Sequence, residues 1–405
     1  MNTRSIICGF FAAVAAIMPL SSCSSEESEK SLPEAEIPIL AWYSIPAEDA
    51  TLERYQELKE CGFTINFSHI SNLDDLKTSL DLAEQAGVKV MATCSELQSK
   101  TDSVVNQIKD HPALYGYFLC DEPAPASFPM LHDWAERIKA ADDTHTLYLN
   151  LLPNYVDLNV LKTKTYREYV HRFIEEVGLP LVSFDFYPIT FDGIRPMWYE
   201  NLQDVAEEAA AAGLPFWAFA LSTAHDPYPL PTMASLRIQM YTNLAYGASV
   251  LQYFTYWNPG GTIWNFHEAP INQNKERSEA YDLVKNMNKE LQARAGVFVG
   301  SKVVSLAHTG ETVPPNCKRL ETMPAHVTSL STTGSDGAVV SLLENGEWNY
   351  LVVVSRTMDE PITLDVVFDE KASMVDREGN IVKLAKGQTS FTIEEGDVAI
   401  FRFKK

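Results

Sequence analysis

The sequence predicts an α/β fold, a (β/α)8 barrel followed by a smaller all-β sandwich. Eight short runs rich in Val, Ile, Phe and Tyr recur between residues 38 and 257, and successive runs begin 25 to 35 residues apart. That spacing leaves room for one helix after each strand, as a parallel barrel requires. The chain of 405 residues is also longer than the roughly 250 residues of such a barrel, so a second domain is expected.

The eight predicted strands are defined by where each apolar run starts. They begin near Pro38, Phe63, Lys89, Leu114, Thr146, Leu181, Pro215 and Ser249. Apolar residues recur at helical spacing between them. Three of these apolar stripes end at glycines, namely Gly62, Gly87 and Gly213. Glycine is favoured directly after a helix because it adopts the left-handed backbone of a C-cap. The intervening segments are therefore predicted to be helices.

The pattern changes after the eighth strand. A long loop over residues 258–272 precedes a helix predicted from about Lys275 to Ala295. Beyond residue 300, the alternating runs NYLVVV (349–354) and VAIFRF (398–403), with a turn at 376–380, predict short antiparallel strands. We therefore expect a barrel domain over residues 37–298 and a β-sandwich over residues 299–405.

The N-terminus predicts export. Residues 1–22 have a basic start and a short apolar stretch, as a signal peptide does, and residues 23–36 form a polar, acidic tether. The end of this segment resembles a bacterial lipoprotein signal, and the acidic run resembles the export tag of surface lipoproteins of Bacteroidetes. This resemblance implies lipid on Cys23 and an outer-membrane lipoprotein exposed at the cell surface. An ordinary signal peptide cut near the same place is the alternative.

Charge and motif content exclude several kinds of partner and cofactor. The net charge of −22 repels nucleic acid and favours neutral or cationic partners. The nine histidines lack the H-E-x-x-H or H-x-H spacing that places two metal ligands on one face, and the cysteines form no CxxC pair. No phosphate-cradling glycine loop and no G-x-S-x-G occur. We therefore expect no metal site, no cofactor and no nucleic-acid partner.

Acidic residues at the ends of the predicted strands are the candidates for chemistry, because barrel active sites lie at those ends. Glu96 follows the third strand, Asp121 and Glu122 follow the fourth, and Asp185 follows the sixth. An ordinary polar loop explains Glu96 better than a catalytic role does, whereas Glu122 follows an otherwise apolar strand. Glycoside hydrolysis uses one carboxylic acid as proton donor and a second carboxylate as nucleophile or base. We assign Glu122 as the acid and prefer Asp185 as the second carboxylate.

Aromatic, amide and imidazole side chains gather at the same predicted barrel end. Rings stack on the apolar faces of sugars, while Asn and His bond hydroxyl groups. Packing inside the barrel is the competing explanation for any single ring. The residues that we expect to bind a carbohydrate are Asp121, Tyr43, His69, Asn150, Tyr187, Trp217, His225, Asp226, Tyr256 and Trp257.

The segment around Glu122 resembles a known motif. Residues 116–123 read GYFLCDEP and are similar to the strand-four motif of clan A glycoside hydrolases, in which an Asn-Glu-Pro triplet carries the acid/base Glu. Asp121 stands here in place of that Asn. The segments DFYP (185–188), LR (236–237), YGA (246–248) and YFTYW (253–257) are similar in order and spacing to family 42 β-galactosidases. The resemblance covers about residues 38–296 and implies that Glu122 is the proton donor.

The predicted seventh strand departs from that family. Clan A enzymes carry a nucleophilic Glu there, but residues 215–223 read PFWAFALST and the next acid is Asp226. Asp185 or Asp121 would activate water for an inverting reaction if the carboxyl groups lie about 6.5–9.5 Å apart. Asp226 would alternatively move in as nucleophile or base. The third possibility is a barrel that only binds sugar, which would make the protein a surface glycan-binding lipoprotein.

Overall fold

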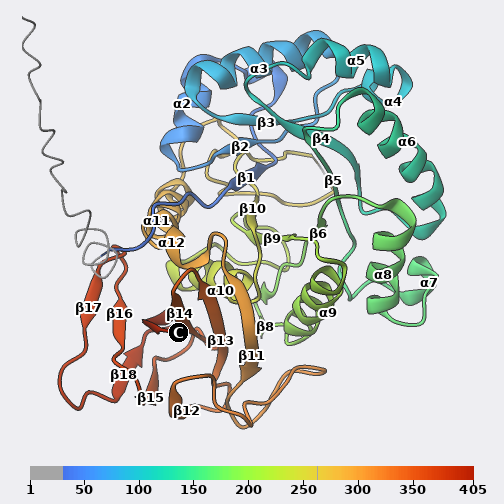
Figure 1. Cartoon of the computed structure of the whole chain (residues 1–405). Coiled ribbons are helices and arrows are strands. Elements are labelled where there is room, and N and C mark those ends of the chain that lie inside the picture. The colour runs from blue at the N-terminus through green and yellow to red at the C-terminus, as the bar shows by residue number, and fades with distance from the viewer. Residues whose placement is uncertain (1–30, 262) are drawn as a thin grey trace, which may run out of the picture.

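The computed structural model describes residues 31–261 and 263–405. The predicted signal peptide, Cys23 and most of the acidic tether lie outside the described residues. The described chain forms a barrel surrounded by helices and a β domain packed on one side of it (Figure 1). Among the described residues, no helix is long and apolar enough to cross a membrane.

The predicted strands form one parallel sheet that closes on itself. They are β1 (Ile39–Trp42), β2 (Ile65–Asn66), β3 (Lys89–Ala92), β4 (Leu114–Asp121), β5 (Thr146–Asn150), β6 (Val182–Phe184), β9 (Phe216–Leu221) and β10 (Val250–Phe254). Their order is β5-β4-β3-β2-β1-β10-β9-β6. A parallel bridge between Leu151 and Phe184 joins the two ends, where the Leu151 N–H donates to the Ser183 carbonyl over 2.8 Å. The barrel prediction is confirmed.

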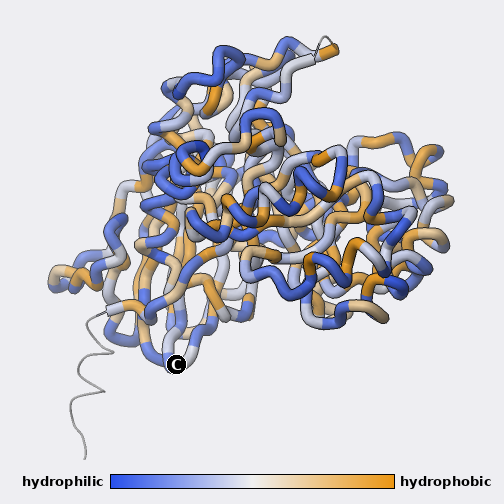
Figure 2. Tube along the Cα trace, turned by 90° about the horizontal axis from the view of Figure 1, so that it is seen from above, coloured by the Kyte–Doolittle hydropathy of each residue, from blue (hydrophilic) through white to orange (hydrophobic). Residues whose placement is uncertain are grey.

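Helices cover the outside of this sheet (Figure 1). They are α2 (Leu52–Glu60), α3 (Leu73–Ala86), α4 (Ser95–Ser99), α5 (Thr101–Ile108), α6 (Phe128–Ala141), α7 (Leu158–Leu161), α8 (Tyr166–Val177), α9 (Met197–Ala212), α10 (Met233–Ala245), α11 (Glu279–Ala293) and α12 (Ala295–Phe298). Gly87 and Gly213 end α3 and α9 with φ of 72° and 69°, as the left-handed C-cap requires. Hydrophilic and hydrophobic residues are interspersed along the chain (Figure 2). Helices such as α3 and α8 bury one apolar face, whereas α10 is buried on nearly all sides.

The last barrel helix begins later than the sequence predicts. It starts at Glu279, because the Ser278 hydroxyl accepts the Ala280 N–H over 3.1 Å and so caps the helix there. The preceding residues, including Lys275, belong to the long loop over the barrel end.

The C-terminal region forms two antiparallel sheets. A six-stranded sheet has the order β11-β13-β14-β19-β16-β17, and a three-stranded sheet has the order β12-β15-β18. The strands are β11 (Lys302–His308), β12 (Val327–Thr332), β13 (Ala338–Asn345), β14 (Trp348–Ser355), β15 (Ile362–Phe368), β16 (Ser373–Val375), β17 (Ile381–Lys383), β18 (Ser390–Ile393) and β19 (Val398–Lys404). The expected all-β region after the barrel is present.

Strand alternation explains how the β domain packs on the barrel. Successive side chains of a strand point to opposite faces. In β14, Tyr350 and Val352 join the large core that includes the barrel helices, while Leu351 and Val353 face the core between the two sheets. The six-stranded sheet is therefore buried on both faces, which makes it the layer that connects the two parts.

A buried ionic cluster lies where the barrel helices meet the β domain. Glu290 of α11 accepts from Arg237 over 2.9 Å, and Arg294 lies 3.4 Å from the same carboxylate. The Tyr241 hydroxyl also donates to Glu290 over 2.9 Å, and Arg294 donates to the Asp376 carbonyl over 2.8 Å. Arg294 is only 2% exposed, so the charge on its guanidinium depends on Glu290 for compensation.

We predict that Glu290→Ala lowers the free energy of unfolding by about 3–5 kcal/mol, because it leaves the buried Arg294 charge unpaired. Urea unfolding followed by far-UV circular dichroism measures the loss. Glu279→Ala, at an exposed position of the same helix, is the matched control and should cost less than about 1 kcal/mol. A loss of similar size in both variants would contradict the role given to Glu290.

Candidate functional site

A cavity of about 720 Å³ opens at the C-terminal ends of the barrel strands. Carboxyl and amide groups from β4, β5 and β6 form one part of its wall, and aromatic rings form most of the rest. The lining residues are Trp42, Asp121, Glu122, Asn150, Leu152, Tyr155, Val156, Asp185, Tyr187, Arg195, Met197, Phe219, His225, Pro227, Tyr228, Phe254, Trp264 and Phe266. Such a mostly apolar pocket with a few convergent polar groups is typical of a ligand site.

The backbone holds Glu122 in an unusual conformation. Its φ is 47°, in the left-handed region that a residue with a side chain rarely adopts. The Glu122 N–H donates to the Asn150 carbonyl over 2.8 Å, and the Tyr169 hydroxyl donates to the next carbonyl, that of Pro123, over 2.8 Å. These two bonds fix the turn on both sides of Glu122. Strain of this kind costs about 1–3 kcal/mol and is concentrated at functional sites.

The carboxyl groups of Glu122 and Asp185 line the same cavity. Each lies close enough to the other to influence its pKa. Burial and the neighbouring charges of Glu122 and Asp121 raise the pKa of Asp185 well above its ordinary value. Burial also raises the pKa of Glu122, and the neighbouring Asp185 opposes that shift. Because two nearby carboxylates repel, deprotonation of one group disfavours deprotonation of the other.

Asn150 connects the carboxyl groups of the site. Its side-chain N–H donates to Asp185 over 2.8 Å and, more weakly, towards Asp121 over 3.4 Å. Its side-chain oxygen accepts from the Ser183 hydroxyl over 3.1 Å, and that hydroxyl accepts from Gln252 over 2.9 Å. This chain of buried bonds from the barrel interior fixes which end of the amide faces the carboxyl groups.

Asp121 lies at the end of β4, beside Glu122. Burial and the charge of Glu122 raise its pKa to about 7, although the bond from Asn150 opposes the shift. Asp121 and Glu122 are both open to the cavity, so solvent reaches them and weakens the electrostatic effects that raise their pKa. Asp185 is more enclosed, with 9% of its surface exposed.

Two further predicted residues lie on the cavity wall, Tyr187 and His225. The Tyr187 ring packs between Phe219 and Phe254, with ring centroids 6.4 and 5.5 Å away. The His225 Nδ1 is 3.1 Å from the Thr223 carbonyl, which can only accept, so Nδ1 carries the proton. Burial lowers the pKa of His225, so the neutral imidazole is favoured.

Three of the predicted binding residues line a separate, smaller cavity. Tyr43, His69 and Trp257 border a space of about 310 Å³ at the same barrel end. The Tyr43 ring is 6.3 Å from Phe254, which belongs to the larger cavity, so the two spaces are neighbours.

The other three predicted binding residues do not line either cavity. Trp217 is 3% exposed and stacks on Tyr148 inside the barrel, with ring centroids 5.0 Å apart. Tyr256 is fully buried and packs 5.3 Å from Phe63, between the barrel and its helices. Both positions are explained by packing. Asp226 is exposed outside the lining of the larger cavity, where it accepts a bond from Asn265 over 3.2 Å.

Sequence reasoning missed the residues that loops bring to the cavity. Arg195 follows the hairpin of β7 (Ile189–Thr190) and β8 (Gly193–Ile194), and it donates to the Tyr228 hydroxyl over 3.2 Å. Trp264 and Phe266 come from the long loop after β10. The aromatic residues of that loop were the only sign in the sequence that it contributes to the cavity wall. Glu96 lies half-buried on α4, outside the lining of the larger cavity.

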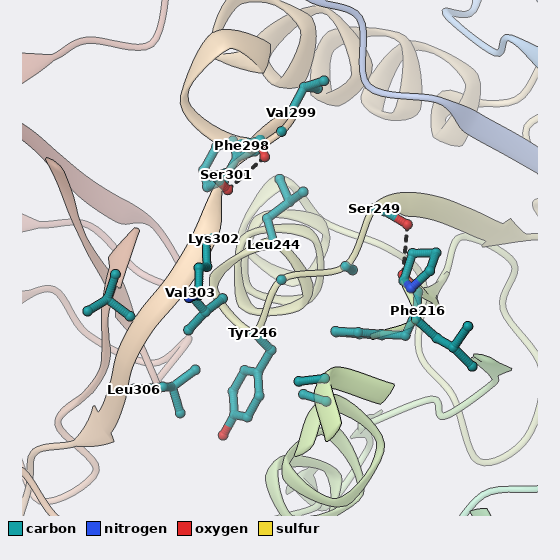
Figure 3. A pocket seen from close by; sticks show the side chains of 18 of the residues that line it. Phe216, Leu244, Tyr246, Ser249, Phe298, Val299, Ser301, Lys302, Val303 and Leu306 are labelled. Atoms are coloured by element: carbon teal, nitrogen blue, oxygen red, sulfur yellow. Dashed lines mark hydrogen bonds between the residues drawn. The ribbon is translucent and has the colours of Figure 1, made fainter. Parts of the chain in front are cut away.

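A second cavity of similar size, about 710 Å³, lies between the barrel and β11, where Phe216 and Tyr246 face Val303 and Leu306 (Figure 3). It borders the first residues of β9 and the segment before β10, at the N-terminal end of the barrel strands. Active sites of such barrels lie at the opposite end. Its serines bond to nearby backbone, Ser249 to Phe216 and Ser301 to Phe298, and Gln203 and Lys318 both bond to Glu207. We interpret it as a gap in domain packing.

Among the described residues, no group of three His, Cys, Asp or Glu side chains is arranged to hold a metal ion. The polar groups on the wall of the larger cavity are carboxyl, amide, imidazole, guanidinium and phenol groups. Such groups bind hydroxyl-rich ligands and transfer protons.

The fold is a (β/α)8 barrel with a pocket at the C-terminal ends of its strands. No protein-family model matches the sequence, and no curated protein sequence matches it. Solved structures do match. A glycoside hydrolase family 5 protein from Bacteroides vulgatus aligns with a TM-score of 0.59 at 12% identity, covering 93% of this chain and 94% of its own.

Two further structures match along most of their length. A catalytic mutant of a family 42 β-galactosidase from G. stearothermophilus has a TM-score of 0.56 at 8% identity, covering 87% of this chain and 95% of its own. An α-amylase from Geobacillus thermoleovorans has a TM-score of 0.55 at 10% identity, with 91% and 98% covered. At these identities the likeness shows the fold, and the resemblance to glycoside hydrolases is confirmed at that level.

The raised pKa of Asp121 predicts a pH-dependent cost to stability. Its folded pKa of about 7 exceeds the ordinary 3.8, so between these values the folded protein binds more protons than the unfolded chain. Stability therefore falls as pH rises through this range, and the cost is complete above about pH 7. We expect Asp121→Asn to raise the Tm relative to the unmodified protein more at pH 8 than at pH 4.

Differential scanning calorimetry at the two pH values measures this change. Asp133→Asn, on an exposed position of α6, controls for the loss of one negative charge elsewhere. An equal Tm difference for Asp121→Asn at both pH values would show that the Asp121 carboxyl titrates alike in the folded and unfolded states.

Proposed function

We propose that this protein hydrolyses glycosidic bonds, with Glu122 as the general acid. The observation that carries the proposal is that Glu122 and Asp185 line one cavity at the C-terminal ends of the strands. Burial raises the pKa of both carboxyl groups, which favours the protonated form that an acid needs to protonate a leaving oxygen.

The walls of the cavity support a carbohydrate as the substrate. Trp264 and Phe254 offer ring faces, while Asn150 and His225 offer polar groups beside them. Rings stack on sugars and polar groups bond their hydroxyls. The net charge of −22 favours a neutral glycan over an anionic one.

We assign Asp185 as the carboxyl partner of Glu122. It is enclosed and held by Asn150, so its position is rigid. A carboxylate that activates water across a sugar lies about 6.5–9.5 Å from the acid, and a nucleophilic one about 5–5.5 Å. Action of Asp185 as base or nucleophile stays a prediction, which the anomer of the product tests.

Sugar binding without hydrolysis is the second candidate function. The observation that favours it is the lack of a carboxylate on β9, where Phe219 faces the cavity instead. A tethered glycan-binding lipoprotein would need only the aromatic wall. Retained binding of a glycan that is never cleaved would support this candidate.

We further propose that lipid on Cys23 tethers the protein to the outer membrane, facing outward. This proposal rests on the N-terminal sequence alone. Metabolic labelling with a tritiated fatty acid, lost in Cys23→Ala, tests it.

We predict that Glu122→Gln lowers kcat by about 10²-fold or more, because the amide cannot donate the proton. Hydrolysis of a panel of aryl glycosides and oligosaccharides measures the loss, and circular dichroism checks that the fold is intact. Glu96→Gln removes a carboxylate at the same barrel end but outside the cavity, so its activity should match the unmodified protein. Equal turnover in Glu122→Gln and Glu96→Gln would remove Glu122 from the reaction.

A further inference from the structure

The carboxyl groups of the cavity all come from neighbouring strands. Asp121 and Glu122 end β4, Asp185 follows β6, and β5 lies between them. The opposite strands β1 and β10 supply Trp42 and Phe254. Among the described residues that line the cavity, no carboxylate therefore faces Glu122 from across the space where a sugar ring would lie.

Two polar groups beside Glu122, on Asp121 and Tyr187, are available to bind a substrate. Among the described residues, the Asp121 carboxylate has one weak side-chain donor, the Asn150 amide at 3.4 Å. Tyr187 borders the same cavity. Burial and the nearby charges of Asp185, Asp121 and Glu122 raise the pKa of Tyr187, so its hydroxyl keeps its proton and can donate. The wall thus presents an acceptor and a donor near the proposed acid.

The rings around Tyr187 make an apolar surface next to this pair. Phe219 and Phe254 pack on it, and Trp42 lies 5.6 Å from Phe219. An acceptor, a donor and an apolar surface together match an N-acetyl group, which has one N–H, one carbonyl oxygen and one methyl. The group is also neutral, so the acidic protein does not repel it.

Building on the proposed function, we propose that the substrate is a 2-acetamido-2-deoxy-β-glycoside whose own acetamido oxygen replaces the missing nucleophile. Asp121 accepts the acetamido N–H, the Tyr187 hydroxyl donates to its carbonyl oxygen, and Glu122 protonates the leaving oxygen. The site then needs no carboxylate across the sugar.

The chemistry balances with water as the only co-reactant. In the first step the acetamido oxygen bonds to C1, the bond from C1 to the glycosidic oxygen breaks, and the Glu122 proton passes to the leaving oxygen. The positive charge of the resulting oxazolinium ring lies beside Asp121. In the second step water attacks C1 and gives a proton to the Glu122 carboxylate, while the bond from C1 to the acetamido oxygen breaks. Two displacements at C1 give a product of retained configuration.

Intramolecular attack accounts for a site without its own nucleophile. A group held next to the reacting carbon gains a high effective concentration, so the protein needs only to orient it. Asp121 stabilises the charge that develops on the ring, and such an electrostatic contribution is typically large in an enclosed site. The bond from Asn150 holds Asp185 next to Glu122 throughout.

The test measures how the full-length chain, in detergent, hydrolyses matched substrates. We expect release from 4-nitrophenyl 2-acetamido-2-deoxy-β-glycosides of the gluco or galacto series and none from the corresponding β-glucoside and β-galactoside. NMR should show the β-anomer as first product. The kcat should fall steadily from N-acetyl to N-fluoroacetyl to N-trifluoroacetyl substrates, because fluorine withdraws electrons from the attacking oxygen.

Two variants test the assigned contacts. Asp121→Asn should lower kcat by about 10²-fold, since the charge beside the ring is lost. Tyr187→Phe should lower kcat about tenfold with little change in KM, because one hydrogen bond is removed. Glu96→Gln again serves as the control and should keep the activity and the fluorine dependence of the unmodified protein.

The outcomes separate the two proposals. Cleavage of the plain glycosides as well as the acetamido ones, an inverted product or a kcat independent of fluorine would overturn the acetamido assignment and leave the glycoside hydrolase proposal standing. No release from any substrate of either set, or from N-acetylhexosamine oligosaccharides and neutral oligosaccharides, would overturn both.

Discussion

The hydrogen bonds of Asn150 are the constraint on which the site depends. Carboxyl groups from two strands gather around this residue, and burial together with their mutual repulsion raises the pKa of Asp121 and Asp185. The bond from Asn150 to Asp185, and the backbone bond from Glu122 to the Asn150 carbonyl, hold Asp185 and Glu122 in place. Asn150 of β5 thus determines the positions of Glu122 and Asp185, which follow the two neighbouring strands.

The closed barrel makes this arrangement possible. The bridge at Leu151 brings β5 against β6, and without that closure Asp185 would not lie beside Asn150. The β domain supports the barrel from outside, because its six-stranded sheet is buried on both faces and the Glu290 cluster joins it to the last barrel helices. The β domain contributes no residue to the cavity wall.

Much of the site was predictable from strand positions, and part of it was not. Glu122, Asp121, Asp185, Asn150, Tyr187 and His225 were all named from the sequence and all line one cavity. Trp217 and Tyr256 were named by the same rule and are buried, because a strand-end ring points either to the ligand or into the packed layers according to its register. Arg195 and Trp264 lie on loops whose paths the sequence does not specify.

The sequence by itself determined the barrel, the following β strands and the acids at one barrel end, because hydrophobic periodicity and strand spacing are local properties of the chain. Only the tertiary structure decided that Asp185 bonds to Asn150 and lines one cavity with Glu122, and that no carboxylate of the lining faces them. Distances between side chains of β4 and β6, which lie about 60 residues apart in the sequence, depend on barrel closure. The pKa of each acid follows from those distances and not from the motif that contains it.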